Sequence, residues 1–351
     1  MIANSAAVGT QMILLECCCM SAPKLIVFVG PTASGKSDLA LKVAKRVGGE
    51  IVQADSRTIY RKMNIGTAKP EGEMRHAADV SLEEVQQEGI HAKHPLVDIR
   101  DLFVEKPLAV EGIPHWGIDL VNPDEEFSVA QFKTYAENVI FGILDREHVP
   151  ILAGGTGLYI SAVVDNLLFS DSQPNIELRK ELDDLTNQQL EEYLRAEDPE
   201  AADIIDVHNR RRLLRAVEVI KSTGKKMMNR KRKGDPKFNC LMVGIDLERE
   251  ELYERIDLRV DQMIAAGFVD EVRALKEEYG CEVNSMTGIG YRQICAFLDG
   301  YMKLNEAIEL MKRDSRHYAK RQLTWFRRDA RIKWIETPEQ AQLLVSEFLG
   351  S

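Results

Sequence analysis

The segment that most limits how this chain can fold is GPTASGKS, at residues 30–37. It matches the pattern G-x-x-x-x-G-K-[ST], follows the apolar run KLIVFV at residues 24–29, and opens a stretch with helical spacing at residues 35–46. Glycines in such a turn let successive backbone N–H groups face one anion, and the helix N-terminus adds partial positive charge. The motif therefore predicts a site for a di- or triphosphate, with Lys36 at the terminal phosphate and Ser37 at a Mg²⁺ ion.

Two further short apolar strands are expected at residues 50–54 and 149–153, and they end at Asp55 and Gly154. Apolar strands that alternate with a helix predict an α/β fold, here a P-loop parallel sheet with helices on both faces. Ligands of such sheets bind beyond the carboxyl ends of the strands. Gly30, Asp55 and Gly154 all fall at such ends, so we expect them to share one site.

The chain beyond residue 171 has apolar residues mainly at three- and four-residue spacing, which predicts a mainly helical inserted domain. An apolar run at residues 241–247 could return to the sheet as a strand. The expected helices lie at residues 176–185, 190–196, 210–222, 249–279 and 304–325.

The net charge of −10 argues against a protein that coats nucleic acid indiscriminately. Basic residues are nevertheless clustered: residues 221–237 contain eight Lys/Arg and one acid, and residues 312–331 contain eight and two. Residues 71–111 show the reverse, with ten acids and four Lys/Arg. Such separated patches still allow one face to bind a polyanion. No run approaches 18 apolar residues, so we expect no membrane-spanning helix.

The six cysteines show neither metal-ligand spacing nor a disulfide framework. Cys240, Cys281 and Cys295 are scattered, and the other three are adjacent at residues 17–19. Cysteines without a disulfide framework fit a protein of the reducing cytoplasm. The first 22 residues lack the basic region and the apolar core of a secretory signal, and we expect a flexible extension there, or a true start at Met20.

Six strings stand in order along the chain: GPTASGKS (30–37), ADSRTIYRKMNIGTAKP (54–70), ILAGGTGLY (151–159), RAVEV (215–219), TGIGYRQ (287–293) and KRQLTWFRRD (320–329). Together they resemble the tRNA dimethylallyltransferases, also called isopentenyltransferases. The resemblance implies transfer of a dimethylallyl group from dimethylallyl diphosphate to N6 of the adenosine 3′ of the anticodon, with Mg²⁺ as cofactor and the anticodon stem-loop of tRNA as partner. A monomer suffices for this chemistry. No C-terminal zinc finger is found, which favours a bacterial-type enzyme.

The resemblance implies three catalytic residues. Asp55 would accept the proton from N6, Thr32 would contact the bridging or leaving oxygen of the diphosphate, and Arg259 would bind the diphosphate. The residues themselves leave another interpretation open for Arg255 and Arg259, namely the exposed face of an amphipathic helix. The full diphosphate site would comprise Gly30, Pro31, Thr32, Ala33, Ser34, Gly35, Lys36, Ser37, Arg255 and Arg259, with Mg²⁺ at Ser37.

The resemblance also implies a set of tRNA contacts that ends in a basic helix with an aromatic residue, suited to phosphate contacts and base stacking. For Tyr291 and Trp325 a place in the core is at least as good an interpretation. The set comprises Asp55, Ser56, Arg57, Thr58, Thr156, Arg179, Arg211, Arg212, Leu213, Leu214, Arg215, Gly288, Gly290, Tyr291, Arg292, Lys320, Arg321, Gln322, Trp325 and Arg327.

From pattern and resemblance together we expect a division into four parts. They are a flexible extension at 1–22; a first part of the P-loop core at 23–160, with an acidic insertion at about 71–112 and an inserted helical region at about 113–145; a helical, basic, tRNA-facing region at 161–240; and a return to the core with C-terminal helices at 241–351.

Two alternatives remain open at this stage. A small-molecule or nucleotide kinase of the P-loop type would bind ATP in the same loop, although nucleoside-binding and lid features are not evident. A non-enzymatic RNA-binding regulator would bind tRNA without turnover.

Overall fold

The structure is a computed structural model, and it describes residues 22–74, 107–169, 175–224, 226 and 233–350. Three features considered in the sequence lie wholly or partly outside these ranges: the state of the first 21 residues, most of the acidic insertion at about 71–112, and residues 225 and 227–232 of the basic stretch at 221–237.

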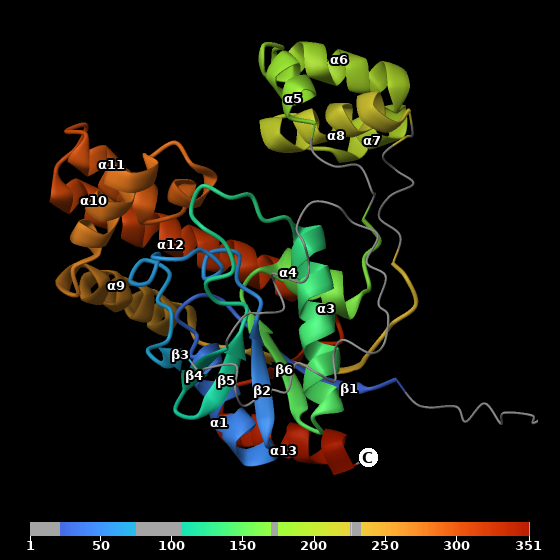
Figure 1. The fold of residues 1–351 in the computed structure, drawn as a ribbon, viewed down its shortest axis with the longest axis vertical. Coiled ribbons are helices and arrows are strands. Elements are labelled where there is room, and N and C mark those ends of the chain that lie inside the picture. Colours follow the sequence, from blue (N-terminus) through green and yellow to red (C-terminus); the bar gives the residue numbers. More distant parts are fainter. Residues whose placement is uncertain (1–21, 75–106, 170–174, 225, 227–232, 351) are drawn as a thin grey trace, which may run out of the picture.

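The centre of the molecule is an eight-stranded sheet with the order β3-β4-β5-β2-β6-β1-β7-β8 (Figure 1). The strands from β5 to β8 in this order are parallel, and the two short edge strands β3 and β4 are antiparallel. The predicted parallel sheet is thus confirmed. The strands are β1 (Lys24–Val29), β2 (Gly49–Gln53), β3 (Glu73–Met74), β4 (Leu108–Val110), β5 (Ile113–Trp116), β6 (Val149–Gly154), β7 (Asn239–Ile245) and β8 (Lys333–Ile335).

Helices cover both faces of the sheet, as the continuous apolar strands indicate. In β1, Ile26 and Phe28 pack in the cluster that contains Leu39 and Val43 of α1 (Lys36–Val47) and two residues of α13 (Pro338–Gly350). The alternate residues Leu25 and Val27 belong to the cluster on the other face, with α3 (Val129–Asp145) and α4 (Gly157–Val164). The strands are therefore buried on both sides.

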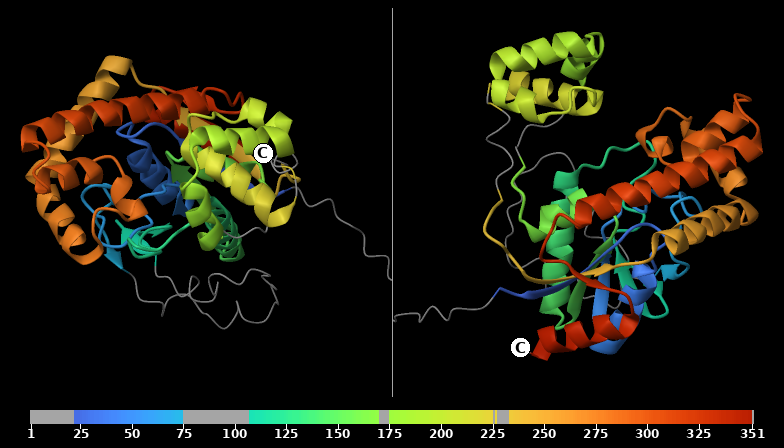
Figure 2. Two further views of the ribbon diagram at one scale, coloured as in Figure 1. Left: turned by 90° about the horizontal axis from the view of Figure 1, so that it is seen from above. Right: turned by 180° about the vertical axis from the view of Figure 1, so that it is seen from behind.

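A second group of helices lies beyond the carboxyl ends of the strands. It consists of α9 (Arg249–Ala265), α10 (Phe268–Tyr279), the 3₁₀ turn Asn284–Thr287, α11 (Tyr291–Leu298) and α12 (Leu304–Phe326). The expected single helix at 249–279 is broken at Gly267, whose φ of 94° ends α9 and turns the chain. Figure 2 shows α12 running across the molecule above the sheet.

A third group, α5 (Ile176–Asp183), α6 (Asn187–Glu197), α7 (Pro199–Ile204) and α8 (Arg210–Thr223), stands apart from the sheet (Figures 1 and 2). Its own small core includes Leu182, Leu190, Leu194 and Leu213. An Asn, Thr or Asp side chain caps the first turn of each of these four helices. Together the caps and the core stabilise a small helical unit in the region that the sequence predicted to be helical.

Two expectations need correction. Residues 113–145 are not a helical insertion, because β5 pairs with β2 and α3 covers the sheet. The strand β5, with the sequence IPHW, has only four residues and contains a proline, so the sequence alone does not predict it.

The cysteines are not all free, because Cys281 and Cys295 form a disulfide with a Cα–Cα distance of 6.2 Å. Only the tertiary fold of α10 and α11 brings these two residues together.

None of the helices in the described ranges combines the length and hydropathy that crossing a bilayer requires.

Candidate active site

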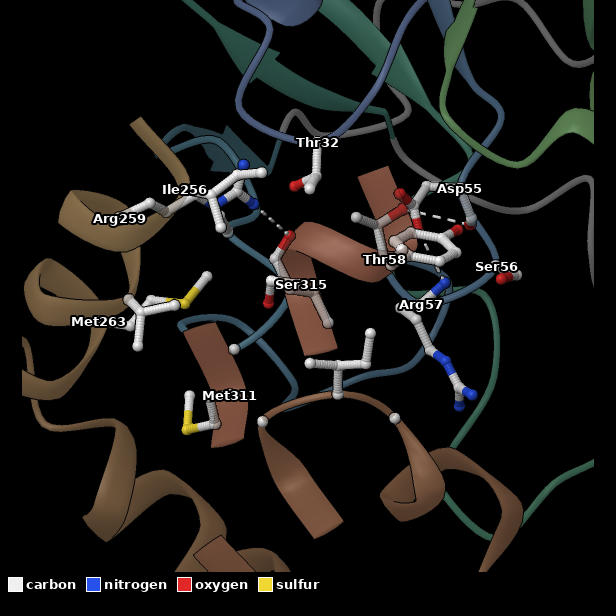
Figure 3. A pocket seen from close by; sticks show the side chains of 18 of the residues that line it. Thr32, Asp55, Ser56, Arg57, Thr58, Ile256, Arg259, Met263, Met311 and Ser315 are labelled. Atoms are coloured by element: carbon white, nitrogen blue, oxygen red, sulfur yellow. Dashed lines mark hydrogen bonds between the residues drawn. The ribbon is translucent and has the colours of Figure 1, made fainter. Parts of the chain in front are cut away.

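A cavity of about 380 Å³ lies at the carboxyl ends of β1, β2 and β6 (Figure 3). One side is formed by the phosphate loop (residues 30–37) and by residues 55–58, which follow β2. The opposite side is formed by α9, α12 and the loop that precedes α11. The motifs at Gly30, Asp55 and Gly154 therefore meet at one site, as the sheet topology predicts.

The phosphate loop is held in its shape by a residue from the C-terminal part of the chain. The Gln322 side chain of α12 accepts a hydrogen bond from the Thr32 N–H at 2.9 Å and donates one to the Gly155 carbonyl at 2.8 Å. Gln322 is buried and lines the cavity, and the structure gives it a positioning role for the phosphate loop. Thr32 stands at the edge of the cavity (Figure 3).

Lys36 is the cation at the base of the phosphate loop. Its ammonium donates to the Pro31 carbonyl at 3.3 Å. Burial lowers the pKa of Lys36 to about 8, the Asp55 carboxylate opposes this shift, and the Arg259 guanidinium adds to it. The three charged groups therefore interact electrostatically within one cavity.

Asp55 directly follows β2 and lines the cavity. Its carboxylate accepts a hydrogen bond from the Arg57 N–H at 2.8 Å. The next residue is tied to the end of β6, since the Ser56 N–H donates to Thr156 Oγ1 at 3.1 Å. These bonds fix the carboxylate at the cavity wall and leave its second oxygen for a ligand.

The two candidate arginines of α9 have different environments. Arg259 lines the cavity, and its guanidinium donates to the Thr67 carbonyl at 3.5 Å; burial lowers its pKa, which Asp55 opposes. Arg255, one turn earlier, is exposed and pairs with Glu251 at 2.6 Å. A Cβ added at Gly35 would lie 3.9 Å from the Arg255 guanidinium. Arg255 therefore lies beside the phosphate loop, exposed and outside the cavity lining.

Several cavity residues were missed by the sequence analysis. Met311, Ser315 and Tyr318 lie on the same face of α12 as Gln322 and line the cavity. Burial, followed by the nearby Asp55 carboxylate, raises the pKa of Tyr318 to about 12, so its phenol remains neutral and bonds to Thr156. Their spacing of three to four residues is the signal that could have identified them.

Most of the predicted tRNA residues fall into three sets. Ser56, Arg57, Thr58, Gly288, Gly290, Arg292 and Arg321 line the cavity, whereas Lys320, Trp325 and Arg327 are exposed on α12 or at its end. A third set lies on α5 and α8: Arg212 is exposed, Arg211 donates to Asn284 at 3.2 Å, and Arg179 and Arg215 both bind Glu218.

Two predicted contacts are buried instead. Leu213 belongs to the core of the α5–α8 group, with Leu214 partly buried against it. Tyr291 is 1% exposed, and its hydroxyl donates to Glu271, so the core interpretation holds for it. Trp325 is 41% exposed, but its ring packs closely enough on Gly157 that a Cβ there would lie 2.4 Å from it.

Comparisons with known proteins identify the family of this chain. A family model described as IPP transferase matches residues 101–329, more than half of the chain. The tRNA dimethylallyltransferase of Acetivibrio thermocellus is 42% identical over 323 residues, which cover 90% of this chain and 92% of that protein. The tRNA dimethylallyltransferase of Moorella thermoacetica is 40% identical over 339 residues, covering 93% and 95%.

Solved structures give the same result. A tRNA isopentenylpyrophosphate transferase from Bacillus halodurans has a TM-score of 0.62 and 35% identity, covering 93% of this chain and 96% of its own. A eukaryotic dimethylallyltransferase acting on tRNA has a TM-score of 0.65 and 28% identity, covering 87% and 70%. On this sequence identity and coverage, the chain belongs to the tRNA dimethylallyltransferases, the family also described as IPP transferases.

Proposed function

We propose that this enzyme transfers a dimethylallyl group from dimethylallyl diphosphate to N6 of the adenosine 3′ of the anticodon in tRNA and releases diphosphate. The observation that carries the proposal is a single cavity with a cationic end and an apolar end. Lys36, Arg259 and the phosphate loop form a cationic end beside Asp55, and apolar side chains of α9, α10 and α12 line the other end. A prenyl diphosphate has the same division into anion and hydrocarbon.

The reaction forms a bond between N6 and the allylic carbon while the bond from that carbon to the diphosphate oxygen breaks. Asp55 would take the proton that N6 loses. Thr32, Lys36 and Arg259 would stabilise the charge that develops on the leaving diphosphate, because preformed donors need no reorganisation as the bond breaks. Enclosure within the cavity would keep water from the allylic carbon.

A Mg²⁺ ion fits the donors of this site. The Ser37 hydroxyl and the Asp55 carboxylate both line the cavity and are hard oxygen ligands. The described residues hold no cluster of three or more His, Cys, Asp or Glu side chains that would enclose a metal, which suits an ion held largely by phosphate oxygens and water. When bound, the ion would neutralise phosphate charge.

Lys36 makes diphosphate binding depend on pH. A pKa of about 8 in the free enzyme means that the ammonium loses its proton as pH rises through this value. Only the charged form attracts the diphosphate, so we expect dimethylallyl diphosphate to bind about tenfold more weakly at pH 9 than at pH 7. Calorimetric titration at pH 7, 8 and 9 measures this. Lys36→Met should bind dimethylallyl diphosphate weakly at every pH. If the affinity of that variant fell equally steeply between pH 7 and pH 9, another group would cause the pH dependence.

The exposed basic residues of α12 are proposed to contact tRNA phosphates. We expect the double variant Lys320→Ala/Arg321→Ala to bind tRNA more weakly and to reduce the slope of log Kd against log salt by about 1 to 2, since each lost phosphate contact removes nearly one unit. Filter binding between low and moderate salt measures the slope. Lys42→Ala removes an exposed lysine of α1 and serves as the control; an unchanged slope in the double variant would rule out these contacts.

The direct test of the function is incubation with tRNA and labelled dimethylallyl diphosphate, followed by nucleoside analysis. Label in N6-modified adenosine supports the proposal. A P-loop kinase would instead be stabilised against heat more by ATP than by dimethylallyl diphosphate and would release phosphate from ATP. A non-enzymatic regulator would bind tRNA without incorporating label. The residues of one chain complete the cavity, so we propose that a monomer is sufficient.

A further inference from the structure

One end of the cavity is lined by apolar side chains. It is formed by Met263 of α9, Phe268 at the start of α10, Ile289, and Met311 of α12. Figure 3 shows Met263 and Met311 on the side of the cavity opposite Thr32. A hydrocarbon chain attached to a diphosphate in the phosphate loop would therefore point toward these side chains.

The back of the apolar end is a tightly packed aromatic pair. The rings of Phe268 and Tyr291 meet edge to face, with centroids 5.0 Å apart. At Gly66 an added Cβ would lie 2.2 Å from Phe268 Cε2 and 2.5 Å from Tyr291 Cζ. At Gly290 an added Cβ would lie 3.1 Å from the same phenylalanine ring. Because backbone touches Phe268 on two sides, its ring has no space to withdraw into.

The partly buried Glu271 carboxylate ties this pair to the loop that follows β2. Glu271 Oε1 accepts hydrogen bonds from the Tyr291 hydroxyl at 2.7 Å and the Gly66 N–H at 3.1 Å. Its other oxygen accepts from the N–H groups of Asn64, at 2.9 Å, and Ile65, at 2.7 Å. Charge-assisted bonds to one carboxylate hold α10, α11 and this loop together. The aromatic wall is consequently a rigid part of the fold.

Met263 and Met311 line the cavity in front of the Phe268–Tyr291 pair, and their side chains are flexible whereas the pair is rigid. Methionine is unbranched and adapts its shape readily. Met311 is 2% exposed and contacts the Gly290 region, since a Cβ at Gly290 would lie 3.4 Å from its terminal methyl. Met263 is partly buried against the same cluster. The depth available to a hydrocarbon chain is therefore set by these two side chains, with Phe268 as the limit behind them.

We propose that Met311 and Met263, backed by Phe268, determine the length of the prenyl chain and restrict the donor to five carbons. This proposal rests on the proposed function and names a determinant of its donor specificity. A ten-carbon chain would gain apolar burial if there were space for it, so selection against it has to be steric. Removing the Met311 side chain beyond Cβ supplies space at the closed end and leaves the phosphate loop and Asp55 unchanged.

The test compares kcat/KM for dimethylallyl diphosphate and geranyl diphosphate with tRNA as acceptor. We expect the wild type to favour the five-carbon donor by about a hundredfold or more, and Met311→Ala to reduce this ratio at least about tenfold. Met302→Ala is the matched control, because Met302 packs against the same apolar cluster as Met311 but does not line the cavity; its ratio should equal that of the wild type. If Met311→Ala fails to fold, Met263→Ala provides the same comparison.

Two results would overturn the proposal. One is a wild-type enzyme that uses both donors equally well, and the other is a Met311→Ala enzyme that loses activity with both donors in the same proportion. If the wild type transfers no prenyl group from either donor, the proposed function fails. Calorimetric affinities for the two diphosphates then test separately whether the methionines exclude the longer chain. Tighter binding of geranyl diphosphate than of dimethylallyl diphosphate by the wild type would refute this exclusion. A gain in affinity for geranyl diphosphate alone in Met311→Ala would support it.

Discussion

Asp55→Asn is expected to lower the rate of prenyl transfer by about a hundredfold or more and to leave the Kd for tRNA within about threefold of the wild type. The amide has the shape of the carboxyl group and still accepts the hydrogen bond from the Arg57 N–H. It cannot accept the N6 proton, and it removes the negative charge that faces Lys36 and Arg259. Single-turnover rates with saturating tRNA, beside binding measured separately, distinguish the two effects.

The control for this variant is Asp145→Asn. Asp145 is the exposed last residue of α3, outside the cavity lining, so the same chemical change there should leave both rate and affinity unaltered. An Asp55→Asn enzyme with the wild-type rate would exclude Asp55 as the base. A loss of tRNA affinity large enough to explain the loss of rate would instead assign Asp55 to binding.

Arg259→Gln is expected to lower kcat by about a hundred- to a thousandfold, because a partly buried guanidinium at the departing diphosphate acts in a site that excludes much of the solvent. Arg255→Gln, one turn away on the same helix, should change kcat by less than about threefold and raise KM for dimethylallyl diphosphate by less than about tenfold. Both variants remove one positive charge. They differ in position, since Arg259 lines the cavity and Arg255 is exposed and paired with Glu251.

Steady-state kinetics with varied donor concentration check this pair. Equal losses in the two variants would show that net charge near the phosphate loop matters more than a guanidinium at the leaving group. An effect of Arg259→Gln on KM alone would place the arginine in ground-state binding.

The parts of this fold that could be predicted are those that short-range patterns determine. Apolar strands at β1, β2 and β6 with a glycine-rich turn require only local propensity and the rules of parallel sheets. These same rules bring Asp55 and the phosphate loop together. Residues 113–145 were assigned wrongly because a four-residue strand such as β5 carries too little periodicity to recognise.

The parts of the site that could not be predicted depend on which side of a helix faces the cavity. The residues alone present Arg255 and Arg259 as equivalent, and only the packing of α9 against α12 separates Arg259, which lines the cavity, from the exposed Arg255. Gln322 lies in a basic string that suggested RNA contact, yet its amide reaches the phosphate loop. Glu271 belongs to no motif, because three of its four hydrogen-bond donors are backbone N–H groups.

The bridge made by Gln322 also has a consequence for biosynthesis. Its side chain joins Thr32 and Gly155, from which it is separated by 290 and 167 residues along the chain. The phosphate loop leaves the ribosome early in translation, whereas Gln322, which holds this loop, leaves it only with α12, near the end. Contacts of such long range form late because loop closure must come first. A nascent chain therefore carries an unfinished diphosphate site until almost all of it has been made, and an interrupted chain that lacks α12 cannot sequester the donor as the complete enzyme does.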